Sequence, residues 1–305
     1  MKYDFVKLHG LGNDFVFIND WDSTITLTTE QVKHICDRHF GVGADGVILV
    51  RKSPRSECAG YMHYINSDGS LAEMCGNGIR CFTKYLVDNG YVDYRKGSFV
   101  ADTLRGPLSI SFKVDENHKF IEATVDMDEP IFDPPLVPVN FEANAQTPSG
   151  VSFVKEMPLE SPWGTFTFTC VSMGNPHAVC FLDNLDTLDS NAFLSEERTL
   201  ETFDLEKIGA FFESHPVFPA KCNIEFVVCT DKNPKFRVYE RGCGETLACG
   251  TGTCATLVAA ALTGHSPRQN TISLRGGDLF ISWDENNHVI MTGPATQSFS
   301  GSIEL

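Results

Sequence analysis

The chain has 305 residues, of which 42% are hydrophobic and 21% are charged, as expected for a folded protein of one large or two ordinary domains. Its formal net charge of −16 argues against a nucleic-acid partner, because a phosphate backbone is bound by a basic face. No apolar run approaches the roughly 18 residues of a membrane span, and charged Asp4 and Lys7 interrupt the apolar residues where a secretion signal would lie. These features predict a soluble, cytoplasmic protein without a membrane or nucleic-acid partner.

The first half of the chain predicts a β-rich unit with two helices. A helix is expected over residues 29–39 with Thr28 as its N-cap, and a second helix should begin after Cys75 and end near Gly90. The expected strands lie at 2–19 with a central Gly-rich turn, at 47–50, at 61–65 and, as two or three strands, between 97 and 127.

Residues 41–46 match the spacing of a dinucleotide-binding glycine motif in the wrong structural context. Gly41, Gly43 and Gly46 would follow a helix and precede a strand, whereas the motif must follow a strand and open a helix. The sequence also lacks a P-loop lysine motif. We therefore do not predict nucleotide binding.

The second half predicts a similar unit after a proline-rich segment, 128–162, which we interpret as a linker with irregular strands. A helix is expected over 204–215, and another should begin after Cys249 and end at Gly264. Beyond Pro294 we expect a short tail. The expected strands lie at 164–173, 178–182, 223–229, 235–239, 271–282 and 288–292.

Two copies of the pattern Cys-Gly-X-Gly, beginning at Cys75 and Cys249, are the strongest chemical signal in the chain. Each copy is followed by apolar residues at helical spacing, so each cysteine should lie just before a helix N-terminus. The unpaired N–H groups there favour a bound anion or a thiolate, and such a position lowers a cysteine pKa from about 8.5 towards neutrality. Two matched thiols of this kind indicate a reaction that needs both an acid and a base.

The other cysteines predict structural roles. The chain has eleven cysteines and no Cys-x-x-Cys pair, so we expect free thiols rather than a disulfide framework or a zinc site. Cys81 and Cys254 stand further along each predicted helix and should lie in the core. The histidines show no ligand spacing, and we predict no metal site.

Several features recur in the same order in both halves. A Gly-Asn turn between two strands contains Asn13 in the first half and Asn175 in the second. A later strand ends in a polar residue, Asn66 or Glu240, each nine residues before its cysteine (75 − 66 and 249 − 240). We interpret this order as an internal repeat of a β-rich unit wrapped around one long helix.

Together these motifs resemble those of the diaminopimelate epimerases, a pyridoxal-independent family of bacterial lysine and cell-wall synthesis. The resemblance covers nearly the whole chain. It is carried by these segments: Gly10-Leu11-Gly12-Asn13-Asp14-Phe15, Gly43-Ala44-Asp45-Gly46, Asn66-Ser67-Asp68-Gly69, Met74-Cys75-Gly76-Asn77-Gly78-Ile79-Arg80-Cys81, Met173-Gly174-Asn175-Pro176-His177, Tyr239-Glu240-Arg241-Gly242 and Ala248-Cys249-Gly250-Thr251-Gly252.

The resemblance implies an α/β fold of two pseudo-symmetric domains, each a barrel-like sheet wrapped around a central helix, with the active site in the cleft between them. The N-terminal domain would span residues 1–127, with the tail 295–305 returning to it, and the C-terminal domain would span 128–294. Two features depart from the family's pattern: several members carry Gln where Gly46 stands, and the segment 128–162 is long.

The resemblance also implies that Cys75 and Cys249 are the catalytic pair. Inverting an α-carbon without a cofactor requires a base on one face and an acid on the other, with pKa values near the working pH. In the family's pattern Cys249 removes the proton from the L-centre and Cys75 delivers one to the opposite face. His177 and Glu240 resemble residues that tune this pair. No metal and no cofactor, pyridoxal phosphate included, is implied.

The remaining residues would bind the two ends of the substrate. The N–H groups of Gly76, Asn77, Gly250 and Thr251 would hold the reacting carboxylate. Arginine suits bidentate binding of the other carboxylate, and asparagines offer neutral polar contacts. The residues implied for the distal end are Asn13, Asn66, Asn175, Asn223 and Arg241. Glu240 is also implied to bind the substrate. We expect diaminopimelate as the small-molecule partner and a homodimer as the assembly.

Two alternative functions remain open at this point. Proline and hydroxyproline racemases typically carry His where Asn77 stands, and phenazine-type isomerases lack the cysteine pair, but a racemase for another amino acid fits the same motifs. A thiol redox protein that oxidises Cys75 and Cys249 to a disulfide belongs to a different class. That function leaves the paired glycine-rich anion sites and the Asn/Arg set without a role.

Overall fold

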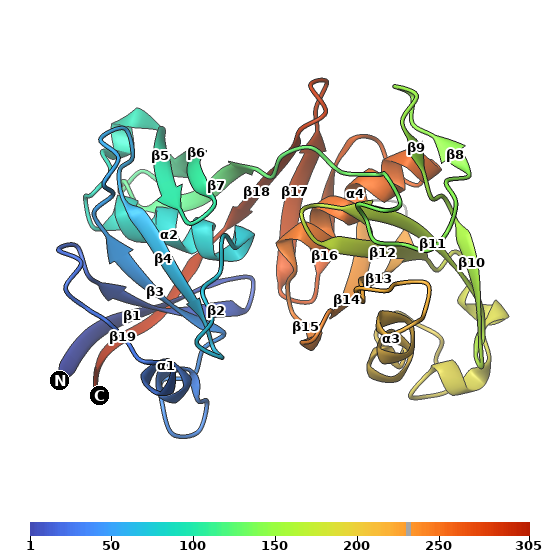
Figure 1. The fold of residues 1–305 in the computed structure, drawn as a ribbon, viewed down its shortest axis with the longest axis horizontal. Helices are drawn as coiled ribbons and strands as arrows, with labels where there is room; N and C mark the ends of the chain where they lie inside the picture. Colours follow the sequence, from blue (N-terminus) through green and yellow to red (C-terminus); the bar gives the residue numbers. More distant parts are fainter. Residues whose placement is uncertain (230–232) are drawn as a thin grey trace. The chain divides into compact units, whose positions relative to one another are not determined.

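The computed structural model describes residues 1–229 and 233–305 and divides into two compact units (Figure 1). Unit 1 comprises Met1–Asp126 and Thr292–Leu305, and unit 2 comprises Met127–Met291. The boundaries expected from the sequence, after residues 127 and 294, lie one and three residues further along the chain.

Unit 1 contains two helices and a curved sheet. Its elements in chain order are β1 (Lys2–Gly10), β2 (Asn13–Asn19), α1 (Thr29–Cys36), β3 (Gly46–Arg51), β4 (Tyr61–Asn66), α2 (Gly76–Asp88), the 3-10 turn η1 (Tyr94–Lys96), β5 (Ser98–Thr103), β6 (Gly106–Val114), β7 (Phe120–Asp126) and β19 (Thr296–Glu304), with the end of β18 (Val289–Pro294). Thr28 caps α1 through a reciprocal pair of hydrogen bonds with Gln31, which confirms the predicted start of that helix.

The strand order of unit 1 brings distant segments together. β1 pairs antiparallel with β2 and with β19, so the two ends of the chain lie side by side (Figure 1). β2 is parallel to β3, β3 is antiparallel to β4, and β4 is parallel to β5. β5, β6 and β7 then form an antiparallel meander. The tail expected beyond Pro294 is therefore a nine-residue strand.

Helix α2 lies in the core of unit 1, inside the curved sheet (Figure 1). Ile79, Cys81, Phe82 and Leu86 are fully buried, and even the guanidinium-bearing Arg80 has no exposed surface. A helix that is covered on all sides needs apolar or satisfied side chains around its whole circumference. Arg80 meets this requirement because it donates to the carbonyls of Gly76 and Pro294 and to the Asn77 side chain.

Unit 2 repeats this plan. Its elements in chain order are β8 (Ala145–Gln146), β9 (Ser152–Phe153), β10 (Met157–Ser161), β11 (Gly164–Ser172), β12 (Pro176–Phe181), η2 (Leu185–Thr187), η3 (Ser190–Ala192), α3 (Leu205–Glu213), β13 (Asn223–Cys229), β14 (Pro234–Glu240), β15 (Gly244–Thr246), α4 (Gly250–Thr263), β16 (Gln269–Leu274), β17 (Gly277–Trp283) and the start of β18. Gly264 ends α4 in the left-handed conformation (φ 87°), as the sequence predicted.

The main strand pairings of the two units correspond. In unit 2, β11 is antiparallel to β10 and β12, as β1 is to β19 and β2 in unit 1. β12 is parallel to β13, β13 is antiparallel to β14, and β14 is parallel to β16, matching β2 to β5. The internal repeat expected from the motifs is thus present in the topology.

The segment 128–162 is an integral part of unit 2. Val154, Met157 and Leu159 are buried in its core cluster, beside an aromatic group. That group consists of Phe166, Phe168, Phe203, Phe212 and Phe226. Although the segment is rich in proline, it closes one side of this core, so a change there affects the stability of unit 2 and not merely the connection between units.

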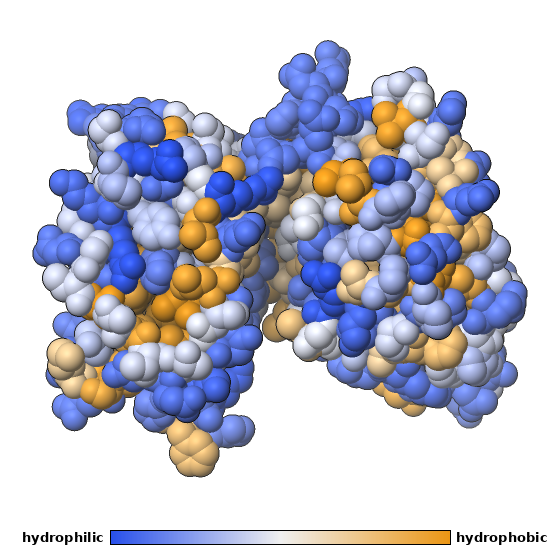
Figure 2. Space-filling view, viewed as in Figure 1, coloured by the Kyte–Doolittle hydropathy of each residue, from blue (hydrophilic) through white to orange (hydrophobic). Residues whose placement is uncertain are grey.

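The surface in Figure 2 is mostly hydrophilic, with apolar residues in separate patches. Among the residues that the structure describes, no helix has the length and apolar character needed to cross a membrane.

Candidate active site

Cys75 and Cys249 occupy the same structural position in the two units. Cys75 is the N-cap of α2 and Cys249 is the N-cap of α4, both with extended backbone. The Gly78 N–H donates to the Cys75 sulfur at 3.4 Å, and the Gly252 N–H donates to the Cys249 sulfur at 3.3 Å. Each sulfur therefore takes the place of the side-chain oxygen that ordinarily caps a helix, where partial positive charge favours an anion.

In unit 1, the Asn13 side chain links Cys75 to Asn77. Asn13, at the start of β2, accepts from the Asn77 amide at 3.0 Å and lies 3.8 Å from the Cys75 sulfur. The Asn13 amide donates to Asp45 at 2.7 Å. Asn66 lies at the end of β4 and donates to the Ser70 hydroxyl at 3.0 Å. Asn13 and Asn77 thus meet at the cysteine, whereas the hydrogen bond of the Asn66 amide holds its own turn.

In unit 2, His177 lies beside Glu225 on neighbouring strands. Nδ1 of His177 is 2.6 Å from Oε1 of Glu225, and Nε2 is 3.1 Å from Oδ1 of Asn175. Both His177 and Glu225 are fully buried. Histidine after a proline is more often a surface residue, but here strand β12 carries it into the interior.

The other predicted residues of unit 2 form a second group around β13 and β14. Asn223, at the start of β13, donates to the Pro176 carbonyl at 2.7 Å and accepts from the Arg241 N–H at 2.9 Å. The Arg241 side chain is exposed and donates to the Ala220 carbonyl at 3.3 Å. Glu240, the last residue of β14, accepts a hydrogen bond from the Thr246 hydroxyl. The Thr251 hydroxyl lies 3.5 Å from the Cys249 sulfur.

A family model described as diaminopimelate epimerase matches residues 5–132 and 169–297. The chain belongs to the diaminopimelate epimerase family. It is 45% identical over 304 residues to a diaminopimelate epimerase from Acetivibrio thermocellus, covering 99% of this chain and 98% of that one. It is 42% identical to a diaminopimelate epimerase from Leptospira biflexa, with full coverage of both chains. These matches confirm the family that the sequence motifs predicted.

Solved structures show the same fold at low sequence identity. A phenazine biosynthesis protein of the PhzF family from Bacillus anthracis is similar with a TM-score of 0.65 and 16% identity, covering all of both chains. A hydroxyproline epimerase from Agrobacterium vitis, with bound trans-4-hydroxy-L-proline, has a TM-score of 0.64 and 14% identity, covering 100% of this chain and 93% of that one. These comparisons confirm the predicted two-domain α/β epimerase fold.

The surroundings of Gly46 leave no room for a side chain. A Cβ added there would lie 2.5 Å from the Tyr64 ring and 2.7 Å from the Ile65 carbonyl oxygen. The Tyr64 side chain therefore fills the space beside Gly46, and it packs edge-on against Phe15 with ring centroids 5.5 Å apart. A glutamine at this position would require Tyr64 to move.

The expectation that a helix N-terminus lowers the cysteine pKa is wrong for Cys249. Burial raises the pKa of this thiol well above its ordinary value, and the carboxylates of Glu240 and Glu225 raise it further. The hydrogen bonds from Thr251 and Gly252 oppose this shift but are outweighed. In the ligand-free protein Cys249 is therefore a thiol at neutral pH, because nearby negative charges and the loss of water exceed the effect of the helix end.

Cys81 and Cys254 are fully buried on α2 and α4, as predicted, and all eleven cysteines are free. We expect Cys81→Ser and Cys254→Ser each to lower the free energy of unfolding by about 1–2 kcal/mol, because a hydroxyl is costlier to bury than a thiol. Turnover of the folded variants should stay within about twofold of the wild type. Urea unfolding and steady-state kinetics on the same samples measure both effects, and a large kinetic loss without destabilisation would contradict the structural assignment.

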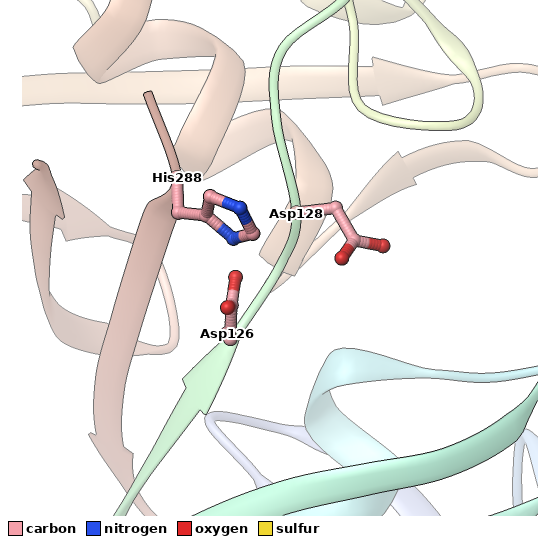
Figure 3. A group of neighbouring side chains, drawn as sticks. All are labelled: Asp126, Asp128 and His288. Carbon is pink, nitrogen blue, oxygen red and sulfur yellow. The ribbon is translucent and has the colours of Figure 1, made fainter. Parts of the chain in front are cut away.

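One acidic group lies outside both sites. Asp126, Asp128 and His288 each place a ligand atom within 4.8 Å of the others, where the chain passes from unit 1 to unit 2 (Figure 3). Asp128 is exposed, and the other two are partly buried. Exposed acidic groups commonly cluster without an ion. This cluster therefore does not change the prediction, made from the sequence, that the protein has no metal site.

Glu225 is the residue that the sequence analysis missed. It stands in the middle of the apolar run of β13, the one charged residue among Asn223–Cys229. A buried charge in a strand of this kind usually needs a partner, which could have identified it as a candidate.

Proposed function

We propose that the protein interconverts LL- and meso-2,6-diaminopimelate without a cofactor, in lysine and peptidoglycan precursor synthesis. The observation that carries this proposal is the matched placement of Cys75 and Cys249 as sulfur N-caps of α2 and α4. A symmetric reaction that inverts one carbon needs two equivalent acid–base groups, and the internal repeat supplies one in each unit. The family membership of the chain supports the same substrate.

The proton transfer uses one cysteine on each face of the α-carbon. From the L-centre, the Cys249 thiolate takes the α-proton, and the Cys75 thiol gives a proton to the opposite face. In the reverse direction the roles exchange. Burial and two carboxylates raise the pKa of Cys249. Its thiol form therefore suits the role of acid in the reverse direction, and removal of the α-proton requires its ionised form.

The backbone N–H groups at the two helix starts bind the reacting carboxylate. Gly76 and Asn77 begin α2, and Gly250 and Thr251 begin α4, where the first N–H groups have no partner within the helix. These donors stabilise the substrate carboxylate and the negative charge that develops beside it when the α-proton leaves. Glycine at the first position lets a ligand approach the backbone closely.

The remaining polar residues bind the distal amino-acid end. Arg241 pairs with the second carboxylate through its guanidinium, which donates to the Ala220 carbonyl at 3.3 Å. The asparagine side chains of Asn13, Asn66, Asn175 and Asn223 complete this set, while His177 and Glu240 adjust the ionisation of the cysteines. We further propose that the active assembly is a homodimer.

Solvent exchange tests this function directly. In deuterated water, the wild-type protein should convert LL-diaminopimelate to the meso isomer and incorporate deuterium at one α-carbon, without consuming reductant. Activity should persist after exhaustive dialysis, and no pyridoxal absorbance should accompany the protein. Histidine and proline, each with one carboxylate, and glutamate, with two, serve as comparison substrates. Faster racemisation of one of these would identify another amino-acid racemase, and turnover that depends on a thiol reductant would favour the redox function.

A further inference from the structure

The His177–Glu225 pair is an unusual feature of the core of unit 2. The two side chains have no exposed surface and meet at 2.6 Å. Oε1 of Glu225 binds His177, but Oε2 is buried without a hydrogen-bond partner among the described residues. An unsatisfied buried carboxylate oxygen destabilises a fold, so its presence indicates a role other than stability.

The internal repeat supplies a comparison within the same molecule. His177 pairs with Asn223 across β12 and β13, as Phe15 pairs with Gly46 across β2 and β3. Glu225 lies two residues after Asn223, and Ile48 lies two residues after Gly46, so Glu225 corresponds to Ile48. The environment agrees, because a Cβ at Gly252 would lie 2.7 Å from Glu225 Oε1, and a Cβ at Gly78 would lie 3.5 Å from Ile48 Cδ1.

The same fold position thus holds an apolar pair in unit 1 and a polar pair in unit 2. Phe15 and Ile48 are fully buried without any polar atom in their side chains. Replacing a buried ion pair by apolar residues of similar size is often neutral or stabilising. The topology therefore does not require His177 and Glu225, and only the unit with Cys249 has them.

The pair lies next to the catalytic sulfur. The Cβ position at Gly252 is 2.7 Å from Glu225 Oε1 and 3.1 Å from the Cys249 sulfur. These two distances place the carboxylate within about 6 Å of the sulfur, close enough for one charge to affect the other. The titratable groups that influence Glu225 come from several elements: His177 on β12, Cys170 on β11, Glu240 on β14, Cys222 before β13 and Cys249 at α4.

We propose that Glu225 is a positioning residue of the epimerase, the carboxylate that fixes the orientation of His177 beside Cys249 and places a negative charge next to both. Both ring nitrogens of His177 face oxygen atoms, so both of its hydrogen-bonding positions are held. The carboxylate holds Nδ1, which leaves Nε2 directed at Asn175 and fixes the ring plane. This inference rests on the proposed epimerase function.

Glu225→Gln is the decisive variant, because it keeps the side-chain shape and removes the charge. We expect kcat at neutral pH to fall roughly 10- to 100-fold with KM changed less than about threefold, as for other residues that orient an acid–base group. The pH profile of kcat/KM should also change, because the variant removes a negative charge that acts on the Cys249 thiol.

The stability of the variant separates this role from a purely structural one, because the kinetic loss should appear in protein that is still folded at the assay temperature. Burial raises the pKa of Glu225, although His177 opposes the shift. When the pKa of a carboxyl is higher in the folded than in the unfolded protein, the free energy of unfolding falls as the pH rises above the pKa of the unfolded state. Glutamine does not ionise, so the variant avoids this loss of stability at neutral pH. A purely structural Glu225 would show the opposite, a loss of activity that follows a loss of melting temperature.

Thr256→Val is the matched control. Its hydroxyl is the other buried side-chain atom without a partner among the described residues, on the same helix as Cys249. Removing it should leave kcat and the pH profile unchanged. A double-mutant cycle with His177→Gln tests whether Glu225 acts through His177. When His177 is already replaced, Glu225→Gln should lower kcat by less than about a further threefold.

Two further measurements test the same proposal if Glu225→Gln does not fold. The double variant His177→Phe with Glu225→Ile copies the pair of unit 1 and should fold without epimerase activity. In the wild-type protein, nitrogen-15 NMR of His177 should show a proton on Nδ1, hydrogen-bonded to Glu225. An Nδ1 without a proton, wild-type kcat in Glu225→Gln, additive losses in the cycle or an unfolded double variant would each overturn the proposal. An inactive wild-type protein with a protonated Nδ1 would instead overturn the epimerase function alone.

Discussion

Cys75→Ser and Cys249→Ser are each expected to reduce kcat for diaminopimelate epimerisation by roughly 10²- to 10⁴-fold, the range over which a positioned general acid or base contributes. A serine hydroxyl is a far weaker acid than a thiol and cannot serve as the thiolate base. The fold should be unaffected, because serine is a preferred N-cap and its oxygen can accept from the Gly78 or Gly252 N–H that the sulfur now binds.

The two serine variants should also differ from each other, and the difference shows which cysteine acts on which face of the substrate α-carbon. Cys75→Ser keeps Cys249, so with LL-diaminopimelate it should still exchange the α-proton with solvent faster than it forms the meso isomer. Cys249→Ser should neither exchange nor invert that centre. Deuterium incorporation and meso formation, measured together in deuterated water, separate these outcomes. Wild-type inversion in either variant would refute the two-cysteine mechanism.

Arg241→Met is expected to lower kcat/KM for diaminopimelate by roughly two to three orders of magnitude, because the distal carboxylate loses a bidentate, charged partner. The Arg241 side chain is exposed and its hydrogen bond to the Ala220 carbonyl is long, at 3.3 Å, so its loss should change the melting temperature little. A kinetic loss then reports substrate binding. Solvent exchange of a smaller amino acid with a single carboxylate should fall much less.

Lys221→Met is the matched control for this experiment. Lys221 is a cation next to Ala220, the residue whose carbonyl binds Arg241, and its ammonium pairs with Glu213 at 3.1 Å. Removing this neighbouring positive charge should change kcat/KM less than about threefold if the effect of Arg241 is specific. Equal losses for both classes of substrate in Arg241→Met would mean that the residue supports the reacting end or the fold.

The sequence by itself determined the local features of the candidate site. A cysteine before two glycines and an apolar helical run specifies an N-cap, and both Cys75 and Cys249 are N-caps. The Thr28 capping box and the Gly264 helix end were likewise predictable, because each depends on residues within one turn of helix. The order of motifs also indicated the family, since each motif is short and keeps its place along the chain.

Only the tertiary structure decided the features that depend on distant residues. Strand β19 is almost entirely exposed and lacks an apolar alternation, so nothing in its own residues predicts it; its pairing with β1 makes it a strand. The pKa of Cys249 reverses the local expectation because burial and the carboxylates of Glu240 and Glu225 come from other elements. His177 and Glu225 are 48 positions apart and meet only because β12 and β13 are parallel neighbours. Helix caps are short-range interactions within a few residues, whereas burial and charge in a core are set by whichever strands the fold brings together.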